Sequence, residues 1–275
     1  MDTFTHLLLG HAMGVAASTL GTAPPNAVYW AVVVGNSLPD VDVPLSFLLR
    51  GDFKWHRTVT HTVAGAAGVS LVAALVLARA MPGAHPGWIF FWTLVGAWSH
   101  VATDVLNLFG VKLSTLARKS TAAGILHLTD PVLLGLLVTG SLLRAAPLGL
   151  ALCGGYILWR AVRAGQIRRT LRQGGALRAD LIPWYAGWRY VTEYRDRIEY
   201  GTWQVQGPVA LATYPRPDTA LLEQLGRHSQ VKTFLASARY PYAIIGSDEV
   251  VWGCALRQIR ADYRPLRLKL PCPES

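Results

Sequence analysis

The residues of this sequence that could carry chemistry are histidines and aspartates that lie beside or inside apolar segments. No glutamate occurs in the first 192 residues, so six aspartates supply every carboxylate of the apolar N-terminal part. Ionisable groups at membrane depth are costly and by default indicate a functional site. Eight candidates lie at the ends of apolar runs: His6, Asp40, Asp42, His56, His61, His100, Asp104 and Asp130.

The spacing of these residues would let several side chains reach one ion. His100 and Asp104 are four residues apart and therefore share one face of a helix. Asp40 and Asp42 lie beside Pro39, which should keep this segment out of a helix. Both carboxylates are then expected to point the same way.

His56 and His61 lie just before and at the start of the next apolar run. Neutral imidazole with carboxylate, without thiolate, suits a divalent metal: zinc, or manganese or iron where oxygen ligands dominate. The three cysteines are scattered and have no ligand spacing. Eight candidate ligands exceed the need of one tetrahedral ion, so two or more ions are expected, an arrangement typical of phosphoester hydrolysis.

Membrane helices are needed to position these residues. With 52% hydrophobic residues, 15% charged residues and a mean hydropathy of +0.30, the chain is too apolar for an ordinary soluble enzyme. A bilayer-spanning helix needs about 20 mainly apolar residues, and the shortness of some runs leaves four to six membrane helices. The runs are Leu7–Leu20, Ala27–Leu38, Thr62–Ala78, Trp88–Gly110, Pro131–Leu143 and Ala145–Trp159.

Basic residues indicate the orientation, since Lys and Arg accumulate on the cytoplasmic side of a membrane. They precede the third run and follow the fourth and sixth, and only Arg79 and Arg144 fall on the opposite side. The C-terminal part is therefore expected in the cytoplasm. If the runs alternate in direction, all the ends that carry candidate ligands also lie on the cytoplasmic side.

The expected fold is a mostly α-helical membrane protein with a small C-terminal α+β cytoplasmic domain. The expected domains are a helical membrane domain over 1–160, a basic juxtamembrane linker over 161–185 and a soluble domain over 186–275. Alternating aromatic and β-branched residues from Trp188 to Gln206 predict a hairpin or meander. Further expected elements are the helices Thr219–Gly226 and Gln230–Ala238 and the strands Tyr242–Ile245, Val250–Ala255 and Leu266–Leu270.

Five motifs follow one another in the N-terminal part: Thr5-His6, Leu-Pro-Asp40-Val-Asp42, His56-Arg57-x-x-Thr60-His61-Thr62, Ser99-His100-x-x-x-Asp104 and Asp130-Pro131. In this order they resemble the YdjM-type bacterial inner-membrane proteins called membrane-bound metal-dependent hydrolases. The segment Phe234–Pro241 is similar to the C-terminal pattern of that family. Thr58 stands where the family often has Gly, a departure that leaves the ligand assignment unchanged.

The resemblance implies a multi-pass inner-membrane hydrolase that depends on metal. The order of ligand types is also similar to the helical zinc-dependent phospholipase C and nuclease superfamily, which implies phosphoester chemistry. The hypothesis is hydrolysis of a phosphoester in a lipid or lipid-linked substrate, with Arg57 as phosphate clamp and Asp42 or Asp104 as proton acceptor.

Two alternatives belong to other classes of protein. One is a non-catalytic membrane protein in which metal or His–Asp pairs hold the bundle together while the tail recruits a partner. The other is an ion transporter, which would favour charges near the bilayer midplane. The net charge of +10 is expected to contact membrane lipid rather than nucleic acid, because the chain has no recognition-helix or aromatic-interleaved basic motif.

The orientation gives the first testable prediction. A reporter fused after Ser275 is expected to be active in the cytoplasm, because the basic stretch Arg160–Arg172 follows the last apolar run. The measurement compares a periplasm-dependent and a cytoplasm-dependent reporter on the full chain. Periplasmic activity would contradict both the orientation and the shared face of the candidate ligands.

Overall fold

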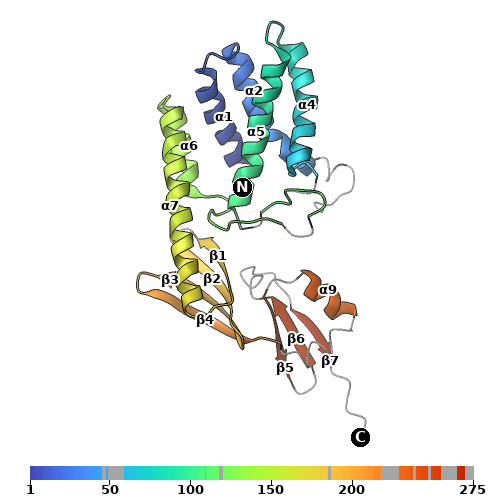
Figure 1. The fold of residues 1–275 in the computed structure, drawn as a ribbon, viewed down its shortest axis with the longest axis vertical. Helices are drawn as coiled ribbons and strands as arrows, with labels where there is room; N and C mark the ends of the chain where they lie inside the picture. Colours follow the sequence, from blue (N-terminus) through green and yellow to red (C-terminus); the bar gives the residue numbers. More distant parts are fainter. Residues whose placement is uncertain are drawn as a thin grey trace. The chain divides into compact units, whose positions relative to one another are not determined.

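The computed structural model describes residues 1–44, 48, 59–108, 110–117, 120–184, 187–217, 229–237, 240–246, 249–254 and 265–269. These residues contain seven α-helices, one short 3-10 helix and two antiparallel sheets (Figure 1). The chain divides into two compact units, Met1–Val162 and Arg163–Ser275. Helix α7, Ala146–Gln173, begins in the first unit and ends in the second.

The first unit is helical, and its helices begin where the sequence supplies caps. The Asp2 side chain accepts a hydrogen bond from Thr5 N at the start of α1, and Thr62 does the same for Gly65 N at the start of α4. Prolines begin α2, α5 and α6, where the absent N–H costs nothing. The elements before α7 are α1 (Thr3–Ser18), α2 (Pro25–Ser37), η1 (Leu38–Val41), α4 (Val63–Ala80), α5 (Pro86–Leu106) and α6 (Pro131–Leu142).

Among the described residues, α4 and α5 are long and apolar enough to cross a membrane. Helix α6 is apolar but shorter. Leucines and valines of α4, including Leu71, Val72, Leu75 and Val76, are exposed, as expected of a helix that faces lipid. The expected count of four to six membrane helices is not confirmed, because α1 and α2, with 16 and 13 residues, are short.

Helices α2 and α5 pack closely because a glycine of each helix lies against the backbone of the other. A Cβ atom on Gly35 would lie 2.1 Å from the Thr93 carbonyl oxygen, and one on Gly96 would lie 2.4 Å from the Val32 carbonyl oxygen. Small residues allow such close approach between membrane helices. The approach brings Asn36 at the end of α2 against α5, where its Nδ2 donates to the Gly96 carbonyl oxygen.

The segment around Pro39 is helical, contrary to expectation. It forms η1, a single 3-10 turn that continues directly from α2. Proline is tolerated there because it occupies the first turn, where its missing N–H has no partner to lose. This turn holds Asp40 buried beside α5 rather than in an open loop.

The second unit contains two antiparallel sheets. The first has the strand order β1-β2-β3-β4 and the second the order β5-β6-β7. Helix α9 packs Val231 against the buried residues Ala243, Val250 and Trp252 of the second sheet. The elements are β1 (Arg178–Trp184), β2 (Gly187–Glu193), β3 (Arg197–Gln204), β4 (Gly207–Pro215), α9 (Ser229–Ser237), β5 (Pro241–Ile245), β6 (Glu249–Cys254) and β7 (Leu266–Lys269).

The sequence predicted the inner strands of the first sheet but not its edges. Strands β2 and β3 form the expected meander, whereas β1 and β4 contain Pro183 and Pro208. Proline cannot donate to a ladder and is tolerated on edge strands, which is where both lie. The predicted linker over 161–185 holds the end of α7 and strand β1, and the predicted helix Thr219–Gly226 lies outside the described residues.

The α2–α5 contact gives the second prediction. Gly35→Ala is expected to destabilise the protein by about 1–3 kcal/mol, because its Cβ would overlap the Thr93 carbonyl group. The control is Gly68→Ala on α4, where a Cβ meets nothing within 4 Å. The measurement is the thermal unfolding midpoint of the full chain in one detergent, and equal midpoints for the two variants would contradict the close contact.

Candidate metal centre

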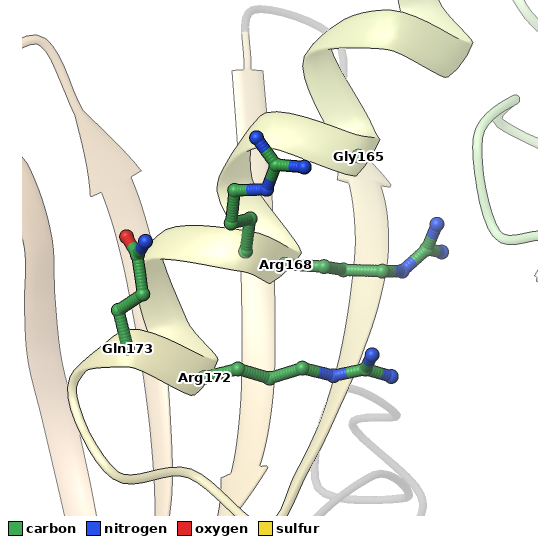
Figure 2. A pocket seen from close by; sticks show the side chains of 5 residues that line it. Gly165, Arg168, Arg172 and Gln173 are labelled. Atoms are coloured by element: carbon green, nitrogen blue, oxygen red, sulfur yellow. The ribbon is translucent and has the colours of Figure 1, made fainter.

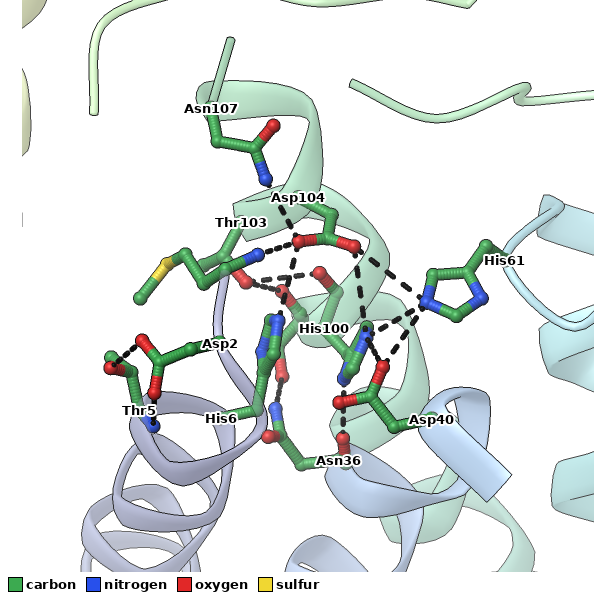
Figure 3. A network of polar contacts seen from close by, with 12 residues as sticks. Asp2, Thr5, His6, Asn36, Asp40, His61, His100, Thr103, Asp104 and Asn107 are labelled. Atoms are coloured by element: carbon green, nitrogen blue, oxygen red, sulfur yellow. Dashed lines mark hydrogen bonds and ion pairs between the residues drawn. The ribbon is translucent and has the colours of Figure 1, made fainter. Parts of the chain in front are cut away.

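Five of the predicted ligands come together in the first unit (Figure 3). His6 lies on α1, Asp40 on η1, His61 before α4, and His100 and Asp104 on α5. All five are buried. They form two overlapping groups of possible ligands, His6–His100–Asp104 and Asp40–His61–His100, in each of which the ligand atoms lie within 4.8 Å of one another.

The ring of His100 is oriented by the backbone of α2. Its Nδ1 lies 2.7 Å from the carbonyl oxygen of Asn36, which can only accept, so Nδ1 carries the hydrogen. In the neutral ring, Nε2 then presents its lone pair to the site. A backbone carbonyl that fixes the tautomer in this way is the usual outer partner of a metal-binding histidine.

The ring of His61 is oriented by Thr60 and Asp42. The Thr60 hydroxyl donates to Asp42 Oδ2 at 2.6 Å and lies 3.1 Å from His61 Nδ1. Because its hydrogen is used on Asp42, the hydroxyl accepts from Nδ1. His61 Nε2 is therefore the second nitrogen that presents a lone pair to the site.

These two lone pairs face each other beside a carboxylate. His61 Nε2 and His100 Nε2 are 3.2 Å apart, and Asp40 Oδ1 lies 3.5 Å from each. Ligand atoms about 2.0–2.1 Å from a zinc ion lie about 3.3 Å apart in a tetrahedron. The three atoms thus have the separations of three tetrahedral ligands, and in neutral rings their lone pairs would repel without a cation between them.

Electrostatics in this group favour a positive charge. Burial raises the pKa of Asp40, but His100 and His61, which can donate hydrogen bonds to it from Nε2 when their rings are protonated, outweigh burial and hold that pKa well below its usual range. Burial lowers the pKa of His61, but hydrogen bonds with Asp40 and Asp42 outweigh it and raise that pKa above its usual value. Asp40 therefore stays ionised, and the site attracts a cation, whether a proton or a metal ion.

The two oxygens of the Asp104 carboxylate contact different residues of the cluster. Its Oδ1 lies 3.3 Å from His6 Nε2, accepts from Asn107 Nδ2 at 3.0 Å and contacts the N-terminal ammonium of Met1. Its Oδ2 lies 3.6 Å from His61 Nε2. Asp104 is therefore the group that joins the two sets of possible ligands.

Among the buried polar atoms of the cluster, His6 Nδ1 and Asp40 Oδ2 have no hydrogen-bond partner among the described residues. The His6 ring stacks on that of His100 with centroids 3.5 Å apart and an angle of 13° between the planes. Buried polar atoms without partners are rare, because no hydrogen bond compensates for the free energy lost when they are removed from water. Such atoms fit a donor set that binds a cation.

The other predicted site residues are not in these two groups. Asp42 lies on the Nδ1 side of His61, away from Asp40, so the two carboxylates do not point the same way as expected. Asp130 caps α6 and accepts from the Tyr156 hydroxyl at 3.0 Å. His56 and Arg57 lie outside the described residues, and their roles stay predictions.

Sequence reasoning missed the residues that orient the ligands. Asn36, Thr60 and Asn107 each contact a ligand or a residue beside one. Asn36 is a buried amide in an otherwise apolar helix, and Asn107 follows Asp104 by three residues, so both had a detectable signal. The Asn36 contact with His100 uses the backbone, which no residue type reveals.

Buried histidines and aspartates at the ends of apolar helices define a membrane protein with a candidate metal centre. The chain belongs to the YdjM inner membrane protein family, whose model matches residues 1–167. This confirms the family that the motifs resemble, and no solved structure matches the chain. The chain is also 29% identical over 138 residues to the uncharacterized protein YfhP of Bacillus subtilis (strain 168), a match that covers 48% of this chain and 42% of that protein.

The orientation of His61 gives the third prediction. Thr60→Val removes the hydroxyl that joins Asp42 to His61 Nδ1, and we expect metal affinity to fall about 10–100-fold. The control is Thr170→Val, an exposed threonine on α7 whose hydroxyl contacts only its own helix. The measurement is zinc affinity by chelator competition, and unchanged affinity in Thr60→Val would remove this role.

Proposed function

We propose that this YdjM-family protein is a metal-dependent hydrolase that cleaves a phosphoester in a lipid or lipid-linked substrate. The proposal places the reaction at the cytoplasmic face of the inner membrane. The observation that carries it is the convergence of His61 Nε2, His100 Nε2 and Asp40 Oδ1 at tetrahedral separations. Three protein ligands with one position left for water or substrate are typical of catalytic rather than structural zinc sites.

The donor set limits which metal would be held. Two imidazole nitrogens and carboxylates, without thiolate, suit zinc, with manganese or iron as alternatives. His100 offers one nitrogen, because its Nδ1 is engaged by Asn36, so it can bind only one ion. His6 and Asp104 would be two of the residues that hold a second ion.

The residues of this chain would prepare the reaction in three ways. A bound metal would lower the pKa of water and neutralise charge on the phosphoryl oxygens. Asn36 and the pair Thr60–Asp42 keep the two imidazoles in the tautomer that faces the site. Arg57 is the proposed clamp for the phosphate oxygens, and Asp42 or Asp104 the proposed proton acceptor.

A non-catalytic role is the second candidate, and burial favours it. His61, His100 and Asp104 are fully buried, and their contacts join α1, η1, α4 and α5. A metal held there would tie the helices of the first unit together without turning over a substrate. The non-catalytic candidate predicts no activity and allows either bound metal or His–Asp pairs alone, so activity and metal content both have to be measured.

The fourth prediction tests metal and activity together. The purified full chain is expected to bind zinc or manganese, and His100→Ala and Asp104→Ala are expected to lower the metal content per chain. His127→Ala is the control, since His127 is half-buried, contacts the Thr129 backbone and is in neither group of possible ligands. Elemental analysis is followed by a panel of phosphodiester and phosphomonoester substrates, including phospholipids.

The same two measurements distinguish the proposed phosphate clamp, Arg57, from the proposed metal ligands. Arg57→Ala is expected to keep its metal and to lose activity, and Arg57→Lys to recover only part of it, because a lysine lacks the bidentate fork. Arg79→Ala, at the end of α4, is the matched control. Metal binding without hydrolysis of any phosphoester would favour the non-catalytic candidate. A wild-type chain that binds no metal would contradict the metal-dependent hydrolase and favour a bundle held by His–Asp pairs.

A further inference from the structure

A basic pocket lies in the second unit, on the last three turns of α7. It has a volume of about 490 Å³ and is lined by Gly165, Arg168, Arg169, Arg172 and Gln173. Arg168 and Arg172 extend side by side from successive turns of the helix (Figure 2). These residues have no part in the candidate metal centre.

Three of the five described residues that line this pocket are arginines. Arg168 and Arg172 are four residues apart on one helix, where like charges destabilise each other. Burial lowers the pKa of Arg168 and Arg172 lowers it further, whereas Asp180 and Tyr240 raise it. Asp180 also lies 3.9 Å from Arg178.

The shape and donors of the pocket suit a phosphate group. Guanidinium groups form paired hydrogen bonds to phosphate oxygens, and the amide of Gln173 adds a further donor. Gly165 leaves the pocket open, since a Cβ there would meet nothing within 4 Å. A volume of about 490 Å³ is within the usual range of about 300–1,000 Å³ for ligand pockets and exceeds what a bare phosphate ion needs.

We propose that this pocket binds a phosphate group, supplied by the headgroup of an anionic membrane lipid. Helix α7 is continuous, and its apolar stretch before Arg160 leads into the basic stretch. Basic residues that follow an apolar run attract anionic lipid, and the chain belongs to an inner membrane protein family. The pocket therefore combines a place near headgroups with donors for their phosphate.

Lipid binding to the full chain tests this proposal. The chain is purified in neutral detergent and titrated with phosphatidylglycerol, with diacylglycerol as the lipid without phosphate, and bound lipid is counted by native mass spectrometry. Phosphatidylglycerol is expected to bind and diacylglycerol not. Arg168→Ala/Arg172→Ala is expected to weaken phosphatidylglycerol binding about tenfold or more, because two charge-assisted contacts are lost.

The control removes the same charge from elsewhere in the second unit. Arg195→Ala/Lys232→Ala changes two exposed basic residues that do not line the pocket, and lipid binding is expected to stay at the wild-type level. Equal phosphatidylglycerol binding by both double variants would overturn the proposal. A thermal unfolding midpoint measured on each variant shows that the change in binding is not a loss of folding.

A competition experiment distinguishes the sources of the phosphate group. Inorganic phosphate that binds alone, and loses this binding in Arg168→Ala/Arg172→Ala, supports a phosphate site supplied by a free anion. Phosphatidylglycerol that stays bound against millimolar phosphate supports the lipid headgroup. A short RNA that displaces the lipid and binds more tightly than it would overturn the proposal in favour of a nucleic-acid surface.

Discussion

The candidate centre depends on the close contact between α2 and α5. Gly35 and Gly96 let the two backbones approach to distances that no side chain would allow. As a result the last carbonyl groups of α2 reach His100, and Asn36 O fixes its tautomer. Without this approach, His100 could rotate and present either nitrogen, and the lone pair that meets His61 would have no fixed direction.

The second constraint is the burial of opposite charges in a small space. Asp40 is held ionised by two imidazoles, and Asp104 is held by donors from the chain terminus and from Asn107. Such a cluster is expensive unless a cation shares it, because unpaired charge in an apolar surrounding is costly. The same argument explains why five buried histidines and aspartates of the first unit lie together in one cluster.

Helical spacing and cap chemistry were sufficient to predict much of this from the sequence. The His100–Asp104 pair and the helix start after His61 follow from local patterns, whereas Asp130, which the sequence predicted as a ligand, caps α6. The opposite placement of Asp40 and Asp42 around His61 could not be predicted, since it depends on where η1 packs. The edge strands β1 and β4 were not predicted, because a proline within a segment argues against a strand. Both strands nevertheless form, since an edge strand can accommodate a residue that donates no hydrogen bond.

The described donor atoms fit one metal ion better than they fit two. Asp40, His61 and His100 offer three donor atoms near tetrahedral separations, and Asp104 Oδ2, at 3.6 and 3.9 Å from the two nitrogens, lies only slightly farther away. The side of Asp104 Oδ1 offers His6 alone as a further ligand among the two groups. A second ion therefore needs an additional donor from the predicted set, and Asp130 already caps α6. Asp40, His61 and His100 are thus the described donors that could most nearly complete a site for one ion, whereas a second ion would need a ligand beyond His6 and Asp104.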